Sequence, residues 1–199
     1  MLKKEADLSA RTVIGVIGAM IAASFAVLVW AVSASNTIRP IGIIIHHSGL
    51  MPPIMSLGAM TRDRLPMDVE SWDAFHQRRG FRAFYWGHFY HIGYHYLIFP
   101  DGRVEEGRPE HCVGAHARGF NNYLGIVLIG DFSSRDNPHG EKGPIAPTPE
   151  QMRALIALCR RLQFRYRVPV DRVLQHRDVA RTECPGDRFP YQQLIESLR

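Results

Sequence analysis

The longest apolar run in the chain lies near its N-terminus, from Val13 to Ala34. These 22 residues carry no charge and include only two serines. A run of about 18 or more apolar residues predicts a membrane-spanning helix, whereas the core of a signal peptide is usually about 7–15 residues long. The length favours an uncleaved transmembrane signal-anchor over residues 13–34. Cleavage after Ala34, as in a signal peptide, stays an alternative because Val32, Ser33 and Ala34 suit a signal peptidase.

Positive charges are placed unevenly around this run. Lys3, Lys4 and Arg11 precede it, and only Arg39 follows it closely. Because basic residues concentrate on the cytoplasmic side of a membrane segment, residues 1–12 are expected in the cytoplasm. The remainder would lie outside the cytoplasm, anchored to the membrane, or secreted if the segment is cleaved. Residues 35–40 are expected to form a short polar linker.

Later apolar segments predict strands and helices in alternation. Residues 41–46 and 124–129 are apolar on both faces, which is typical of central strands in a covered sheet. Residues 93–99 and 104–106 flank a Pro-Asp-Gly turn and predict a hairpin. Helices are predicted from the cap Asp68 to Gly80, after the capping box Thr148-Pro-Glu-Gln151, and over residues 191–198. One α/β domain over residues 41–199 is therefore expected.

Two segments between these elements lack a regular apolar pattern. Residues 48–67 contain three prolines and predict a loop that borders a site. Residues 82–91 are unusually aromatic, with five Phe, Tyr or Trp side chains interleaved with two histidines. This aromatic segment is either a platform for a ligand or a cover that packs on the core.

Composition narrows the functional classes. The net charge of +5 is a mild basic bias, and no basic run or aromatic–basic repeat accompanies it, so no nucleic-acid partner is expected. The three cysteines have no regular spacing that would predict a disulfide framework. Cys159 lies on the apolar side of a predicted helix and is expected to be a buried free thiol. A disulfide with Cys112 is the alternative.

A possible metal site is indicated by residues far apart in the chain. His176 and Cys184 lie eight residues apart, in the segment HRDVARTECPG, and His46 ends an apolar strand in IIIHHS. Imidazole nitrogen and thiolate sulfur are common zinc ligands. The pair alone is a weak signal because no CxxC or HxxxH pair accompanies it.

Four ordered segments carry a family resemblance. They are IIIHHS (43–48), HIGYHYLIFPDGRVEEGR (91–108), GAHARGFNNYLGIVLIGDF (114–132) and HRDVARTECPG (176–186). Together they resemble the zinc-dependent N-acetylmuramoyl-L-alanine amidases, which include phage amidase endolysins and animal peptidoglycan-recognition proteins. The resemblance runs from about residue 41 to the C-terminus. It implies a single domain with a central mixed β-sheet flanked by helices, and a Zn²⁺ site at the edge of a peptidoglycan-binding groove.

Carried over position by position, the resemblance assigns roles to individual residues. The zinc ligands would be His46, His176 and Cys184, with His47 outside the metal's ligands. Tyr94 matches the family's catalytic tyrosine, and Thr182 stands where phage members carry a lysine, so both are candidate catalytic residues. His116 and Asn121 are candidate contacts for the glycan or peptide. Asp178 is expected to hold a turn rather than to support a ligand.

The resulting expectation is a membrane-tethered hydrolase that cuts the amide bond between N-acetylmuramic acid and L-alanine in peptidoglycan. A peptidoglycan-binding module without catalysis is the alternative, and a structural zinc domain is a third possibility. Peptidoglycan and the membrane are the expected partners, and the protein is expected to be a monomer. The family's usual spacing is stretched here, since the aromatic segment is inserted between Arg79-Gly80-Phe81 and HIGYH.

Overall fold

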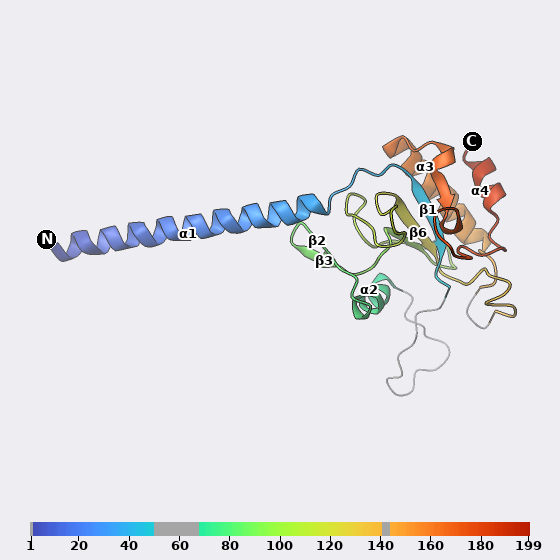
Figure 1. The fold of residues 1–199 in the computed structure, drawn as a ribbon, viewed down its shortest axis with the longest axis horizontal. Helices are drawn as coiled ribbons and strands as arrows, with labels where there is room; N and C mark the ends of the chain where they lie inside the picture. Colours follow the sequence, from blue (N-terminus) through green and yellow to red (C-terminus); the bar gives the residue numbers. More distant parts are fainter. Residues whose placement is uncertain (1, 50–67, 141–143) are drawn as a thin grey trace, which may run out of the picture.

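The computed structural model describes residues 2–49, 68–140 and 144–199. Helix α1, Leu2–Ser35, projects away from an α/β domain that contains the sheet and helices α2 to α4 (Figure 1). Its stretch Thr12–Ser35 is long and apolar enough to cross a membrane. Large apolar side chains along it are more than half exposed, among them Ile14, Met20 and Phe25. The predicted N-terminal apolar helix is therefore confirmed.

Five short strands form the predicted mixed sheet, in the order β5-β4-β6-β1-β7. Their bounds are Ile43–His47 (β1), Tyr96–Ile98 (β4), Val104–Glu106 (β5), Leu124–Leu128 (β6) and Val173–Gln175 (β7). β1 lies between β6 and β7 and is parallel to both, while β4 is parallel to β6 and antiparallel to β5. The central position of β1 and β6 explains why both lack a polar face.

Helices cover both faces of the sheet. α3 (Pro149–Tyr166) and α4 (Tyr191–Ser197) pack on one face, where Ile43 and Ile45 of β1 meet the apolar side of α3. α2 (Val69–Arg78) packs on the other face through Trp72. Since side chains alternate along a strand, His46 lies on the face opposite Ile45. Each fully buried large apolar side chain contributes about 1.5–3 kcal/mol, so the two clusters hold the sheet in place.

Both predicted helix caps are confirmed. The Asp68 carboxylate accepts the backbone N–H of Ser71 at 2.9 Å. Thr148 and Gln151 form the reciprocal capping box, at 3.0 and 3.1 Å. The side-chain amide of Gln151 also donates to the carbonyls of Ile98 and Ile129, each at 3.0 Å. The first turn of α3 is thus bound to the ends of two neighbouring strands.

Several details differ from the sequence-based expectation. β4 begins at Tyr96, so Tyr94 precedes the strand instead of lying within it. The expected linker is shorter, because α1 continues to Ser35 and Thr37 pairs with Cys112. Short 3₁₀ helices, η1 (Val170–Arg172) and η2 (His176–Asp178), flank β7. The alternative disulfide was wrong, since the buried thiols of Cys112 and Cys159 are free. Most of the predicted loop 48–67 falls outside the described residues.

The aromatic segment forms a separate two-stranded hairpin. Strands β2 (Ala83–Tyr85) and β3 (His88–Tyr90) pair antiparallel, and the hairpin lies beside the end of α1 (Figure 1). The rings of Phe84 and Phe89 contact each other, with centroids 5.0 Å apart, and line a groove together with α1. Neither sequence-based alternative anticipated this position.

Candidate functional site

Parallel strand pairing brings the two predicted histidine ligands together. Strands β1 and β7 pair Ile43 with Val173, Ile44 with Leu174 and Ile45 with Gln175. The residues that follow these pairs along the two strands are His46 and His176. Their ring centroids lie 4.4 Å apart. His46 is buried, while His176 begins the 3₁₀ turn that follows β7. Residues separated by 130 positions in the sequence thereby become neighbours at one end of the sheet.

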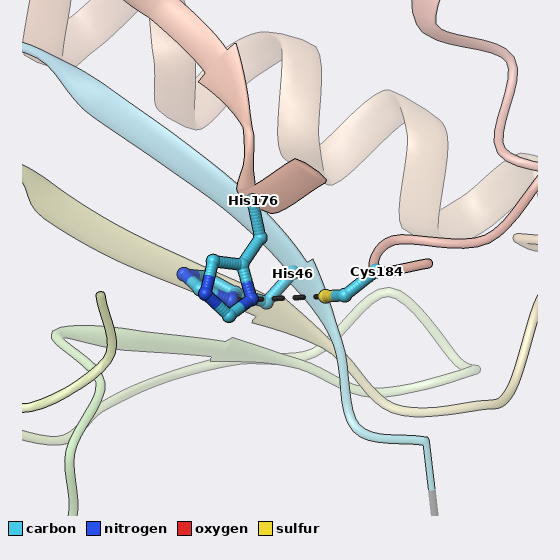
Figure 2. A group of neighbouring side chains, drawn as sticks. All are labelled: His46, His176 and Cys184. Atoms are coloured by element: carbon cyan, nitrogen blue, oxygen red, sulfur yellow. Dashed lines mark hydrogen bonds between the residues drawn. The ribbon is translucent and has the colours of Figure 1, made fainter. Parts of the chain in front are cut away.

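Cys184 reaches the same point from a loop. The backbone N–H of Arg177 donates to the carbonyl of Cys184 at 2.9 Å, and the Arg177 guanidinium donates to the carbonyl of Gly186. The backbone N–H of His47 lies 3.3 Å from the Cys184 sulfur. Figure 2 shows the three side chains converging, with Cys184 Sγ 3.7 Å from His46 Nδ1. Ligand atoms of His46, His176 and Cys184 all lie within 4.8 Å of one another.

A chain of hydrogen bonds fixes the tautomer of His46. His116 Nε2 lies 2.9 Å from the carbonyl of Tyr123, which can only accept, so Nε2 carries the proton. Burial and the nearby His95 lower the pKa of His116 to about 3, so its ring is neutral and Nδ1 is an acceptor. His46 Nε2, 3.1 Å from that Nδ1, is therefore the donor. This leaves His46 Nδ1 unprotonated and directed at Cys184.

Burial controls the charge of the cluster. It lowers the pKa of His46, with a further contribution from His116, and it lowers the pKa of His176. It also raises the pKa of the Cys184 thiol to about 12. Two neutral imidazoles can bind Zn²⁺ directly, and the thiol can bind it as a thiolate because metal binding releases the thiol proton. These three groups form a donor set that fits Zn²⁺. The residues present therefore suit the predicted metal.

Tyr94 and Thr182 border this cluster. The Tyr94 ring lies 5.2 Å from the His46 ring, centroid to centroid, and burial raises the pKa of its phenol, which stays protonated as a donor. The adjacent Gly93 is required, because a Cβ there would lie 2.6 Å from the Ala115 carbonyl oxygen. Thr182 is exposed, and its hydroxyl accepts the backbone N–H of Cys184 at 3.2 Å.

An open groove of about 520 Å³ adjoins Cys184. Thr182 lines it with three basic side chains, those of Arg135, Arg177 and Arg181. Arg135 is paired with Asp136 and with Glu183, at 2.8 and 3.6 Å. The groove is polar and basic on balance, which favours a polar ligand that carries carboxylates.

Comparison with known proteins identifies the fold's relatives. The profile of the N-acetylmuramoyl-L-alanine amidase family matches residues 36–187. The chain belongs to the N-acetylmuramoyl-L-alanine amidase family. The matched region contains His46, His176 and Cys184 together with Tyr94, so the family resemblance drawn from four motifs is confirmed.

The chain is also similar to individual proteins, among them amidases and a peptidoglycan-recognition protein. An endolysin of Enterobacteria phage K11 is 35% identical over 107 residues, which cover 53% of this chain and 65% of the endolysin. Peptidoglycan-recognition protein LB of Drosophila melanogaster is 34% identical over 150 residues, covering 74% of this chain and 55% of that protein. The matches thus span less than two thirds of these two relatives. The solved structure of the amidase LysC from Clostridium intestinale URNW has a TM-score of 0.59 at 33% identity, covering 81% of this chain and 86% of that one.

The other predicted residues of the amidase site have clear contacts. His47 lies outside the cluster, since its Nδ1 accepts the backbone N–H of Phe132 at 3.0 Å. Asp178 holds a turn, as expected, by accepting the N–H of Gln175 at 2.8 Å. The Asn121 side chain accepts the backbone N–H groups of His116 and Ala117, at 3.0 and 3.1 Å. Substrate contact by His116 and Asn121 stays a prediction.

Two contributions to the geometry of the ligand cluster, from Arg177 and His116, were not predicted from the sequence. Arg177 ties the turn that carries His176 to the loop that carries Cys184. His116 orients His46 and was predicted only as a groove contact. The position of Arg177 directly after a candidate ligand was an available signal. The contact between His116 and His46 had none, since it crosses 70 residues of sequence.

Proposed function

We propose that this chain hydrolyses the amide bond between the lactyl group of N-acetylmuramic acid and the L-alanine of the peptidoglycan stem, with Zn²⁺ as cofactor. The observation that carries the proposal is the convergence of His46, His176 and Cys184 beside Tyr94, in a member of the amidase family. Three protein ligands suit a catalytic zinc, because a fourth position then stays open for water.

The residues around the cluster have different roles in the proposed reaction. When bound, zinc supplies a water of lowered pKa and polarises the scissile carbonyl. His116 holds the ring of His46 in orientation, and Arg177 holds the loop of Cys184. Tyr94 donates a hydrogen bond to the negative charge that develops on the carbonyl oxygen. Thr182, at the edge of the groove, positions the attacking water or the carbonyl.

The groove beside Cys184 receives the peptide stem. Arg181 offers a guanidinium group, which can bind a carboxylate through paired hydrogen bonds. Arg135 is already paired with Asp136 and Glu183, and Arg177 donates to the carbonyl of Gly186. The peptidoglycan stem carries carboxylates, so its charge is complementary to the groove. His116 and Asn121 are the candidate contacts for the glycan or peptide, in a loop that Asn121 stabilises by accepting the backbone N–H groups of His116 and Ala117.

The substrate sets the location of the protein. Peptidoglycan lies outside the cytoplasm, and residues 13–34 act as a signal-anchor that keeps residues 1–12 in the cytoplasm. The exposed apolar side chains of Thr12–Ser35 support insertion in a membrane, and the positive charges before the segment support this orientation. The amidase domain over residues 41–199 then works on the wall close to the membrane, as a monomer.

The test uses the full chain in detergent micelles with purified peptidoglycan and mass spectrometry of the products. We expect stem peptides with a free L-alanine amino group, loss of that product on chelation, and recovery when zinc is restored. His46→Ala should abolish the product. His139→Ala, which removes an exposed histidine outside the site, is the matched control and should retain full activity.

Three results would contradict the proposal. Product formation at an unchanged rate after zinc has been removed, as verified by metal analysis, would exclude zinc as the cofactor. Binding of peptidoglycan with no product at full zinc occupancy would instead indicate a recognition module without catalysis. Unfolding upon chelation without any hydrolysis at full occupancy would indicate a structural zinc site.

A further inference from the structure

The aromatic hairpin is attached to the end of α1 by specific hydrogen bonds. The backbone N–H of Trp86 donates to the hydroxyl of Ser33 at 3.0 Å, and the side-chain amide of Asn36 donates to the carbonyl of Phe84 at 3.0 Å. Ser33 is fully buried by this contact, although it lies in an otherwise exposed helix. The hairpin is the same segment that stretches the family's motif spacing.

Apolar side chains extend this contact along the helix. Phe25, Leu28, Val29 and Val32 of α1 line a groove of about 520 Å³ whose other wall contains Phe84 and Phe89. Cleavage after Ala34 would separate Ser33 from Trp86 and remove one whole wall of the groove. The contact between the hairpin and α1 can therefore exist only if α1 stays attached to the domain.

The hairpin exposes two large aromatic side chains, Trp86 in its turn and Phe89 in strand β3. Trp86 is 60% exposed and Phe89 is 53% exposed. Trp86 also has a φ of 47°, followed by Gly87 at 88°, as in the two-residue turns where asparagine and glycine are preferred. A bulky aromatic residue in this left-handed region costs conformational energy. An aromatic tip at a position that favours a small polar residue indicates contact with something apolar.

The length of α1 places this tip at a bilayer surface. A hydrocarbon core of about 30 Å takes about 20 helical residues, which run from Thr12 to Ala31 if Arg11 stays at the cytoplasmic face. Ser33 and Asn36 then lie in the outer headgroup region. Phe25 lies roughly 9 Å inside the outer boundary, at 1.5 Å per residue. The hairpin side chains beside it reach the outer edge of the hydrocarbon.

The chemistry of the hairpin matches that depth. Tryptophan and tyrosine are enriched at membrane interfaces, because their rings are apolar and their polar atoms can reach water. Arg82, which lines the same groove and is exposed, can lay its stem on the apolar wall while its guanidinium reaches lipid phosphates. Aromatic rings and a cation at one level are the pattern of a lipid-facing element.

We propose that the hairpin β2–β3 is a membrane-interface element: it packs on the retained helix α1, inserts Trp86 and Phe89 into the outer leaflet, and holds the catalytic domain at a fixed orientation on the bilayer. Its occupant is lipid, since the aromatic surface is continuous with the apolar face of α1. This inference rests on the proposed membrane anchoring and is independent of amide hydrolysis.

The three tryptophans of the chain provide the test. Trp30 lies in α1, Trp72 is buried in the domain at 2% exposure, and Trp86 is at the hairpin tip. The full chain is reconstituted in phosphatidylcholine–phosphatidylglycerol vesicles with lipids brominated at shallow or deep acyl positions. The Trp30→Phe variant reports Trp72 and Trp86, the Trp86→Phe variant reports Trp72 and Trp30, and the double variant reports Trp72 alone. The core residue Trp72 is left unchanged in all three.

We expect no bromine quenching in the double variant, and quenching in Trp30→Phe that is stronger with shallow than with deep bromines. Quenching in Trp86→Phe comes from Trp30 and shows that α1 is inserted. The intact mass of the protein should show that residues up to Ala34 are retained. Quenching of Trp30 without quenching of Trp86 would overturn the inference and leave the anchoring intact. A blue-shifted but unquenched Trp86 would also overturn it, since protein would then cover the tip. Absence of quenching at both positions would overturn the anchoring as well, whatever the amidase assay shows.

Discussion

Replacement of His116 by alanine should weaken zinc binding although His116 is not a proposed ligand. The variant removes the acceptor for His46 Nε2 and the donor to the Tyr123 carbonyl, at 3.1 and 2.9 Å. Without them, the His46 ring is free to rotate and to carry its proton on Nδ1, the atom directed at Cys184. Loss of a partner that orients a metal ligand typically weakens metal binding 10–100-fold. This corresponds to about 1.4–2.8 kcal/mol, at 1.4 kcal/mol per factor of ten.

The variant should also lose stability. The ring Nε2–H of His46 and the carbonyl of Tyr123 lose the partners that His116 provides, which lowers the free energy of unfolding by about 1–3 kcal/mol. Zinc affinity is measured by competition with a chromophoric chelator, under conditions where circular dichroism shows each variant to be folded. His116→Asn is the matched control, because its side-chain oxygen can replace the Nδ1 acceptor and should recover most of the affinity.

The outcome separates orientation from simple packing. If His116→Ala binds zinc as tightly as the wild type while folded, the hydrogen-bond chain does not position His46. If His116→Asn and His116→Ala lose affinity equally, the imidazole contributes by filling space and the hydrogen bond is irrelevant. If the hydrogen bond positions His46, His116→Asn should bind zinc clearly more tightly than His116→Ala.

Three further predictions concern Tyr94 and Thr182 at the site and the carboxylate of Asp73 in α2, which accepts hydrogen bonds from His91 and Ile92. Tyr94→Phe removes one donor to the developing charge and should lower kcat about 10²–10³-fold with zinc content unchanged; an unaltered kcat would exclude that role. Thr182→Ala should lower kcat/KM about 10-fold or more and shift stability by less than about 1 kcal/mol, because water can replace the lost acceptor for Cys184; Thr182→Lys should restore activity if a donor is needed there. Asp73→Asn should destabilise the protein near neutral pH by about 1–2 kcal/mol, measured by urea unfolding. Burial raises the pKa of Asp73, but hydrogen bonds from the backbone of Ile92 and from His91 outweigh it and lower that pKa below its ordinary value. The stabilisation is thus present above the unfolded pKa of about 4 and is lost as pH falls through the lower folded value, so the variant should show a flatter pH dependence in that acidic window.

Local signals in the sequence predicted the elements well. The all-apolar run before His46 predicted a central strand because a covered strand has no polar face, and Asp68 and Thr148 predicted helix starts because capping acts within one turn. The start of β4 was misplaced at Gly93. Before Tyr96 only His95 bonds to a strand, through Gly125 of β6, while residues 93–95 otherwise bond to residues 107, 108 and 115 outside the strands.

The site itself depended on information that no local pattern carries. His46 and His176 become neighbours through the parallel register of β1 and β7, which is set by packing of the whole sheet. The family resemblance supplied these ligands, and the geometry then explained their position. The contact of His116 with His46 and the attachment of the hairpin to Ser33 are products of tertiary structure. Neither could be read from periodicity or composition.

Zinc titration of the metal-free full chain tests whether hydrolysis depends on the metal. A defined muropeptide is incubated with the protein at increasing zinc, and mass spectrometry measures release of the stem peptide that begins with L-alanine. No release is expected without metal, and the rate should rise with zinc to a plateau at about one ion per chain. Release at the same rate without bound zinc, or no release from folded protein at the plateau, would contradict this expectation.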